Sequence, residues 1–177
     1  MASSDPNIRA IFESLLPPSE QPKRPAVTID QLLAISGDPL KGAELLRQDG
    51  KLSDCLKCHR HGETGTDIGP ELTKIGARLS RRQLIESLLT PSASVAASEF
   101  RQWTIAMLDG TVHSGIIVGR DAASLTLKMI DGRTLKLAED EIDLRQPQTL
   151  SIMPEGRVNT LSVQEIADLI AFLHASR

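Results

Sequence analysis

Two thiols and an imidazole stand close together in residues 55–59, which read Cys-Leu-Lys-Cys-His. Thiols three positions apart can each add to a vinyl group of one porphyrin, and the histidine that follows can coordinate the iron. This C-x-x-C-H spacing is the attachment signature of c-type haem. The sequence therefore predicts one covalent haem, held by Cys55 and Cys58 with His59 as an iron ligand. These are the two cysteines of the chain, so neither remains for a structural disulfide.

The same segment has a second interpretation as a zinc site, with Cys55, Cys58, His59 and His61 as ligands. Structural zinc sites usually draw their ligands from two separated pairs. Four donors this close in the sequence can hardly surround one ion tetrahedrally. We therefore favour haem over zinc.

Iron held by His59 has a second axial position, which decides between electron transfer and ligand binding. Met153 is the candidate we choose, because it lies in a Ser-Ile-Met-Pro-Glu-Gly loop where proline and glycine can hold an extended approach to iron. A His/Met pair gives a relatively high potential, suited to receiving electrons. The other methionines and histidines are weaker candidates for this ligand. Met107 and Met129 are expected in the strand core, and His113 and His174 are expected to be solvated. His61 is too close to His59 in the sequence to reach the opposite side of the porphyrin.

Helical patterns stand at both ends of the chain and must position these residues. Asp5 with Pro6 opens a short amphipathic segment, and a proline-rich stretch over 17–25 is typical of a semi-rigid linker. Capping residues predict four further helix starts. These are Thr28 with Gln31, Asp38 with Pro39, Ser80 with Gln83, and Ser162 with Glu165.

Between residues 98 and 145 the hydrophobic period changes from that of a helix to that of a strand. Asp109-Gly110 and Asp131-Gly132 each separate two alternating runs, which is a strong hairpin signal. Residues 142–144 add a candidate fifth strand. The pattern predicts an antiparallel β module inserted in a helical domain. Its expected role is that of a docking surface or dimer contact, or that of a lid over the haem edge.

The composition of the chain is that of a soluble globular protein rather than that of a membrane protein or a nucleic-acid binder. The chain is 40% hydrophobic and 24% charged, as in soluble globular proteins, and no apolar run approaches the roughly 20 residues that cross a bilayer. A net charge of -3 without a strong basic run lacks the footprint of a nucleic-acid binder. Haem is attached covalently outside the bacterial cytoplasm, yet residues 1–5 lack a signal-peptide pattern. We expect a periplasmic or otherwise exported protein, with its signal removed or as a piece of a longer secreted chain.

The segment 69–78, Gly-Pro-Glu-Leu-Thr-Lys-Ile-Gly-Ala-Arg, resembles the loop that lines the proximal side of the haem in class I cytochromes c. The resemblance implies that the Pro70 carbonyl accepts the Nδ1 hydrogen of His59, which orients the ring and strengthens its donation. It also implies that Leu72 packs on the porphyrin and that Arg78 pairs with a propionate. An ordinary surface position for Arg78 is equally open.

The helical ends resemble the same family. Gly42 and Leu46, together with Leu169 and Phe172, are similar to residues of the N- and C-terminal helices that cross in cytochromes c. A glycine at such a crossing lets the two backbones approach closely. The family more often has an aromatic residue where Leu46 stands, so we expect this contact to be less well filled.

The order of the motifs from about residue 35 to 175 resembles the haem-binding domain found in Planctomycetes and Verrucomicrobia. It runs from C-x-x-C-H and G-P-x-L-x-x-I-G through the 80–92 helix and the β stretch to S-x-M-P-E-G and A-D-L-I-A-F-L. One departure is Arg157, where that family commonly has leucine. In that family the domain often ends large secreted proteins, including dehydrogenases.

The resemblance implies a mainly α fold, namely a class I cytochrome c-like helical fold with a small inserted antiparallel β module. The expected parts are an N-terminal arm and linker over 1–34, the first part of the haem domain over 35–97, the β module over 98–145, and the second part over 146–177.

The implied function is that of an electron carrier rather than an enzyme. A c-type cytochrome domain with iron held by His59 and Met153 would serve a redox partner protein or a fused dehydrogenase. The alternative is a gas-binding, sensory or peroxidase-like haem domain with an open or displaceable distal site. The sequence shows no His/Arg peroxidase constellation, and it leaves the oligomeric state open.

Overall fold

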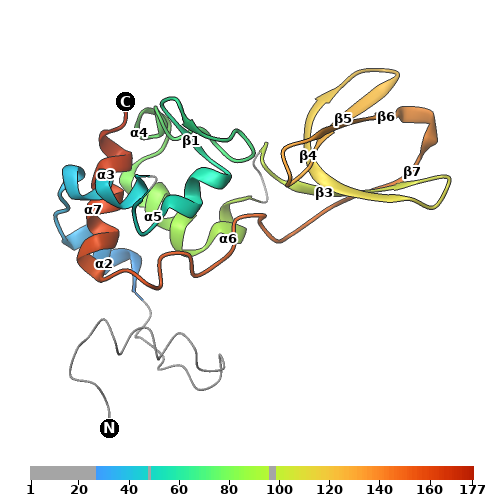
Figure 1. The fold of residues 1–177 in the computed structure, drawn as a ribbon. Coiled ribbons are helices and arrows are strands. Elements are labelled where there is room, and N and C mark those ends of the chain that lie inside the picture. Colours follow the sequence, from blue (N-terminus) through green and yellow to red (C-terminus); the bar gives the residue numbers. More distant parts are fainter. Residues whose placement is uncertain (1–26, 48, 96–98) are drawn as a thin grey trace, which may run out of the picture.

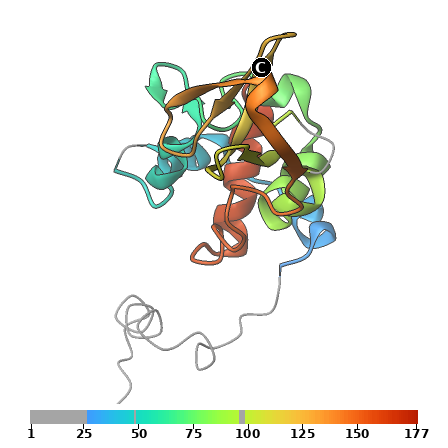
Figure 2. The same ribbon diagram turned by 90° about the vertical axis from the view of Figure 1, so that its right-hand side faces the viewer.

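The computed structural model describes residues 27–47, 49–95 and 99–177. The expected N-terminal amphipathic segment and proline-rich linker lie outside these residues. In Figure 1 the helices gather in one region and a sheet stands beside them. The view turned toward the sheet has the strands in front of the helical region (Figure 2). The described chain therefore forms two adjoining regions.

Capping residues begin the four longer helices, as the sequence predicts. Thr28, Ser80 and Ser162 each accept a backbone N–H from the third helical residue, whose side chain bonds back to the capping residue. Asp38 accepts the Leu40 N–H, with proline at the first helical position. These helices are α2 (Ile29–Ala34), α3 (Pro39–Leu46), α5 (Arg81–Leu89) and α7 (Val163–Ala175).

Helix α7 lies at the centre of the helical core. Its residues Ile166, Leu169 and Ile170 are almost fully buried, and they belong to one cluster with Leu32 of α2 and Ile85 of α5. Within the described ranges, no helix is both long and apolar enough to cross a membrane.

Helices α3 and α7 cross at Gly42, which confirms the predicted crossing. A Cβ at Gly42 would overlap the Asp168 carbonyl oxygen and lie 2.8 Å from the Cβ of Phe172. Only glycine lets the backbones approach this closely. Leu46 and Phe172 both line a cavity of about 700 Å³, in keeping with a contact that leucine fills incompletely.

Short elements surround the C-x-x-C-H segment and link the longer helices. They hold few buried side chains, so their positions depend on loop hydrogen bonds more than on packing. They are the 3-10 helix η1 (Ser53–Lys57), the ribbon of β1 (Arg60–His61) and β2 (Thr64–Gly65), α4 (Ile75–Arg78) and α6 (Pro91–Val95).

The sheet consists of five antiparallel strands in the order β6-β5-β4-β3-β7. Both predicted Asp-Gly turns are present, and Gly110 and Gly132 have φ of +85° and +83°, where glycine is favoured. Register shifts in β3 and β4 mark irregularities that bend the strands. The strands are β3 (Gln102–Met107), β4 (Val112–Arg120), β5 (Ser124–Lys128), β6 (Thr134–Ala138) and β7 (Ile142–Pro147), with a 3-10 turn η2 (Glu139–Glu141) before β7.

The sheet has a hydrophobic core of its own, and the expected fold class is therefore wrong. Ile105, Leu125 and Leu127 are fully buried beside Met107 and Leu137, in a cluster separate from the one around α7. Across the described residues the protein is 35% helical and 24% strand, with six α-helices and a five-stranded antiparallel sheet. The fold is mixed, not a mainly α cytochrome fold with a small insertion. The strands lie close to their predicted positions, and Met107 is in the sheet core as expected. Met129, also expected in the strand core, lies beyond the end of β5 at the β5–β6 turn.

Candidate functional site

The C-x-x-C-H residues form a single helical turn. Helix η1 continues into Cys58, and the N–H groups of Cys58 and His59 both donate to the Cys55 carbonyl, at 3.1 and 2.8 Å. These hydrogen bonds hold Cys55, Cys58 and His59 together in one compact turn.

Both cysteines are free thiols with partly exposed side chains. Burial raises the pKa of the Cys55 thiol, against the lowering effect of Arg157. A raised pKa keeps this group protonated at neutral pH, whereas nucleophilic and redox-sensing cysteines need a lowered one. Cys55 thus lacks the environment of an activated thiolate.

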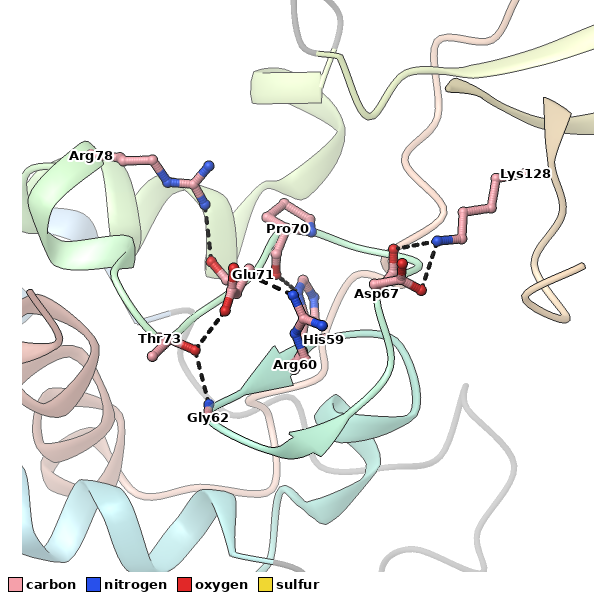
Figure 3. Close-up of polar contacts among 9 residues, drawn as sticks. All are labelled: His59, Arg60, Gly62, Asp67, Pro70, Glu71, Thr73, Arg78 and Lys128. Atoms are coloured by element: carbon pink, nitrogen blue, oxygen red, sulfur yellow. Dashed lines mark hydrogen bonds and ion pairs between the residues drawn. The ribbon is translucent and has the colours of Figure 1, made fainter. Parts of the chain in front are cut away.

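A main-chain carbonyl orients the His59 ring. Nδ1 of His59 lies 2.7 Å from the Pro70 carbonyl oxygen, which is the contact that the resemblance implies (Figure 3). A carbonyl only accepts, so Nδ1 must donate. Burial lowers the pKa of His59, although the bond to Pro70 acts in the opposite direction, so the ring is neutral at pH 7. Its Nε2 then keeps the lone pair that a metal ligand needs.

Two glycines let the following loop pass close to His59. A Cβ at Gly69 would lie 2.7 Å from Cε1 and 3.0 Å from Nδ1 of the ring, and the Gly69 N–H donates to the Cys58 carbonyl at 2.6 Å. Gly65 has φ of +101°, and a Cβ there would overlap the His59 carbonyl oxygen. The imidazole is therefore held between its own turn and the Gly69-Pro70 loop. The sequence analysis missed this contact, although Gly69 belongs to the G-P-x-L motif.

A polar network fixes Glu71, the residue after Pro70 (Figure 3). Thr73 donates from Oγ1 to Glu71 Oε1 at 2.9 Å and accepts the Gly62 N–H at 2.9 Å. Arg78 donates to the Glu71 carbonyl at 2.9 Å, and Arg60 lies 3.7 Å from its carboxylate. These groups are exposed, so each contact alone contributes little, but together they hold the far end of the loop.

Arg78 and Leu72 lie next to this loop. The bond from Arg78 braces the Glu71 carbonyl, and a pairing with a propionate stays a prediction. Leu72 is partly buried against the helical core, and its N–H donates to the Arg60 carbonyl at 2.8 Å. Its packing on a porphyrin also stays a prediction.

Met153 lies, partly buried, in the loop between β7 and α7. Its N–H donates to Ser151 Oγ at 3.1 Å, and the Ser151 N–H donates to Ser92 Oγ of α6 at 3.2 Å. Arg157 forms an ion pair of 3.3 Å with Asp54, the residue before the C-x-x-C-H motif. The loop of Met153 is thereby joined to the Cys55–His59 turn, through a contact that leucine at 157 could not make.

The other methionines and histidines considered as axial ligands have different surroundings. Met107 is buried in the sheet core, His113 lies on β4, and Met129 closes the β5–β6 hairpin. His61 contacts an aromatic ring of α7, with ring centroids 5.0 Å apart. His174 lies in the last turn of α7, where the helix dipole favours it.

Among the residues that the structure describes, no three His, Cys, Asp or Glu side chains are grouped so as to hold a metal ion. The zinc alternative built on Cys55, Cys58, His59 and His61 therefore has no ligand set there. Two free thiols and one neutral imidazole share this turn, which is the set of groups that the expected covalent haem would need.

Two surface cavities border this turn from the side of Leu56. One, of about 700 Å³, is also lined by His61 and Phe172, and the other, of about 400 Å³, by Lys57 and Thr66. Neither is lined by the two cysteines or by His59.

The sheet reaches the loop through Lys128 at the end of β5. Its Nζ lies 2.7 Å from Asp67 Oδ1 and 3.0 Å from the Asp67 carbonyl oxygen (Figure 3). The hydrogen bond from Lys128 is the main cause that lowers the pKa of Asp67. The sequence analysis missed this pair, as it missed Arg157 with Asp54, because no local signal joins residues 61 positions apart.

No model of a known protein family matches the chain, and no curated protein matches it at a significant level. The functional argument therefore depends on the geometry of this site and on the motifs that carry the resemblance.

Proposed function

We propose that this protein is a c-type haem domain that carries single electrons, with haem attached through Cys55 and Cys58 and iron held by His59. The observation that supports this most is the His59–Pro70 hydrogen bond. It leaves Nε2 of a neutral imidazole free on the same turn that presents two free thiols.

Each of the neighbouring residues has a task in this proposal. The bound group would supply a reversible one-electron change at its iron. Pro70 keeps the Nδ1 hydrogen engaged and so makes the imidazole a stronger donor. Gly69 lies against the ring and limits its rotation. Met153 is the proposed second axial ligand, and a thioether there favours the reduced state.

The motif order, similar to that of the haem-binding domain of Planctomycetes and Verrucomicrobia, supports an electron carrier rather than an enzyme. We propose a redox partner protein or a fused dehydrogenase as the electron source. Covalent attachment also supports a location outside the bacterial cytoplasm.

The test uses the full chain, exported in cells that mature c-type haem. We expect a pyridine haemochrome spectrum with one haem per chain and a single reversible one-electron transition. The Cys55→Ala/Cys58→Ala variant should lose the covalent haem, whereas the control His61→Gln should keep it. Rapid binding of carbon monoxide to the ferrous protein would instead favour the open-site sensor, and absence of haem would overturn the proposal.

A further inference from the structure

Lys128 is a poorly exposed lysine with two acceptors on one residue. Its side chain is 13% exposed, while its partner Asp67 is 70% exposed. By comparison, the Lys57–Asp54 pair has side chains 77% and 51% exposed. A poorly exposed ammonium is costly to leave without acceptors, so the contact with Asp67 holds more firmly than an exposed ion pair.

Lys128 binds Asp67, the first residue of the 67–70 loop, and this loop contacts His59. Ile68 is buried, the Gly69 N–H donates to the Cys58 carbonyl, and the Pro70 carbonyl accepts from His59. At its other end the loop is held by the Glu71 network. Lys128 thus fixes, from the sheet, the end that the network does not reach.

We propose that Lys128 is a positioning residue for His59, which couples the β sheet to the axial imidazole through the 67–70 loop. With the loop clamped, Gly69 and Pro70 keep the ring in one orientation and the Nδ1 hydrogen bond short. A displacement of the sheet would then change the donor strength of His59. The redox part of this inference rests on the proposed function, whereas the structural part does not require haem.

The midpoint potential separates the effect of the Lys128 or Asp67 charge from the effect of a loosened 67–70 loop. Lys128→Met removes a positive charge and should by charge alone lower the midpoint potential, whereas Asp67→Asn removes a negative charge and should raise it. Loosening the loop weakens the bond to Pro70 and the imidazole donor, which raises the potential in both variants. Charge alone gives shifts of opposite sign and similar size, because the two groups are in contact, so a positioning role predicts that the sum of the two shifts is clearly positive.

The experiment measures amide hydrogen exchange at Gly69 and Leu72 by NMR, in the full chain with and without haem, and the midpoint potential of the haem form. We expect exchange about fivefold faster in Lys128→Met and Asp67→Asn. Lys128→Arg should restore much of the protection. The control Lys136→Met, on the exposed face of β6, should match the unmodified protein.

Unchanged exchange at both amides would overturn the proposal, as would potential shifts of opposite sign and equal size in Lys128→Met and Asp67→Asn. Asp67 is exposed, so Asp67→Asn keeps the test valid if Lys128→Met fails to fold. If the chain takes up no haem, the proposed function fails, while exchange in the haem-free chain still decides the positioning role.

Discussion

The two sides of the proposed haem site differ in how firmly the chain holds them. On the histidine side, short hydrogen bonds join neighbouring segments: Gly69 N–H to the Cys58 carbonyl at 2.6 Å, His59 to Pro70 at 2.7 Å and Leu72 N–H to the Arg60 carbonyl at 2.8 Å. On the methionine side, Met153 bonds to Ser151 at 3.1 Å, and an exposed ion pair between Arg157 and Asp54 ties the loop to the turn.

This difference indicates that His59 is preorganised, whereas Met153 depends on contacts between distant segments. Preorganised ligands lose little conformational freedom on binding. We therefore expect the methionine side to respond first to mutation, acid or heat. The following predictions test that asymmetry.

Replacing Met153 should have the largest effect. Met153→Ala removes the proposed thioether ligand, so the far-red ferric absorption band that reports methionine ligation should disappear. The midpoint potential should fall, within the roughly 0.8 V range that axial ligands cover. The control Met129→Ala, in the β5–β6 hairpin, should keep the band. A band that survives Met153→Ala would exclude Met153 as the ligand.

Crowding the histidine side should cost about 2 kcal/mol. Gly69→Ala places a methyl group 2.7 Å from Cε1 of His59, which forces the ring or the loop to move. The matched control is Gly119→Ala in β4, where the nearest atom, the Cβ of Thr126, lies 3.7 Å away. Urea unfolding of the haem-free proteins measures both changes. Equal stability of the two variants would refute the tight packing of Gly69 against the ring.

Breaking the ion pair that joins the Met153 loop to the Cys55–His59 turn should have a smaller effect on stability. Arg157→Gln removes the exposed ion pair with Asp54, at a cost of about 0.5 kcal/mol. The methionine band should then be lost at a lower temperature, while haem attachment is unchanged. Arg133→Gln, which breaks a pair with Asp131 in the sheet whose arginine is more exposed, is the control. An equal effect of both variants would speak against a local role of Arg157.

The smallest expected effect is the loss, at low pH, of the stability that the Asp54 carboxylate contributes. The hydrogen bond from Lys57, and then that from Arg157, lowers the pKa of Asp54 below its ordinary 3.8. A carboxylate with a depressed pKa stabilises the fold above its unfolded pKa, and this contribution is lost as the pH falls through the folded value. Unmodified protein and Asp54→Asn should therefore differ in unfolding midpoint at neutral pH and converge below about pH 3.8. A constant difference down to acid pH would contradict the assignment.

The features that the sequence predicted correctly have local causes. Capping residues such as Ser80 and Ser162 determine where helices start, and each Asp-Gly pair determines a turn, because the groups involved are only a few positions apart. The alternating pattern places Met107 in a strand core, but it does not show that Ile105, Leu125 and Leu137 meet across strands to form a cluster separate from the helical one.

The same distinction applies to the site. The contact of His59 with Pro70 is the one that the resemblance to class I cytochromes c implies, and the structure has this hydrogen bond. The ion pairs of Lys128 and Arg157 join segments that only the folded chain brings together. No spacing rule predicts such pairs.

The central claim is that Cys55 and Cys58 carry a covalently attached haem. The most direct measurement is the intact mass of the full chain after export in cells that mature c-type haem. We predict the mass of the polypeptide plus one haem, and the bare polypeptide mass in the Cys55→Ala/Cys58→Ala variant. A bare polypeptide mass for the unmodified chain, from cells that attach haem to a control cytochrome, would contradict the claim.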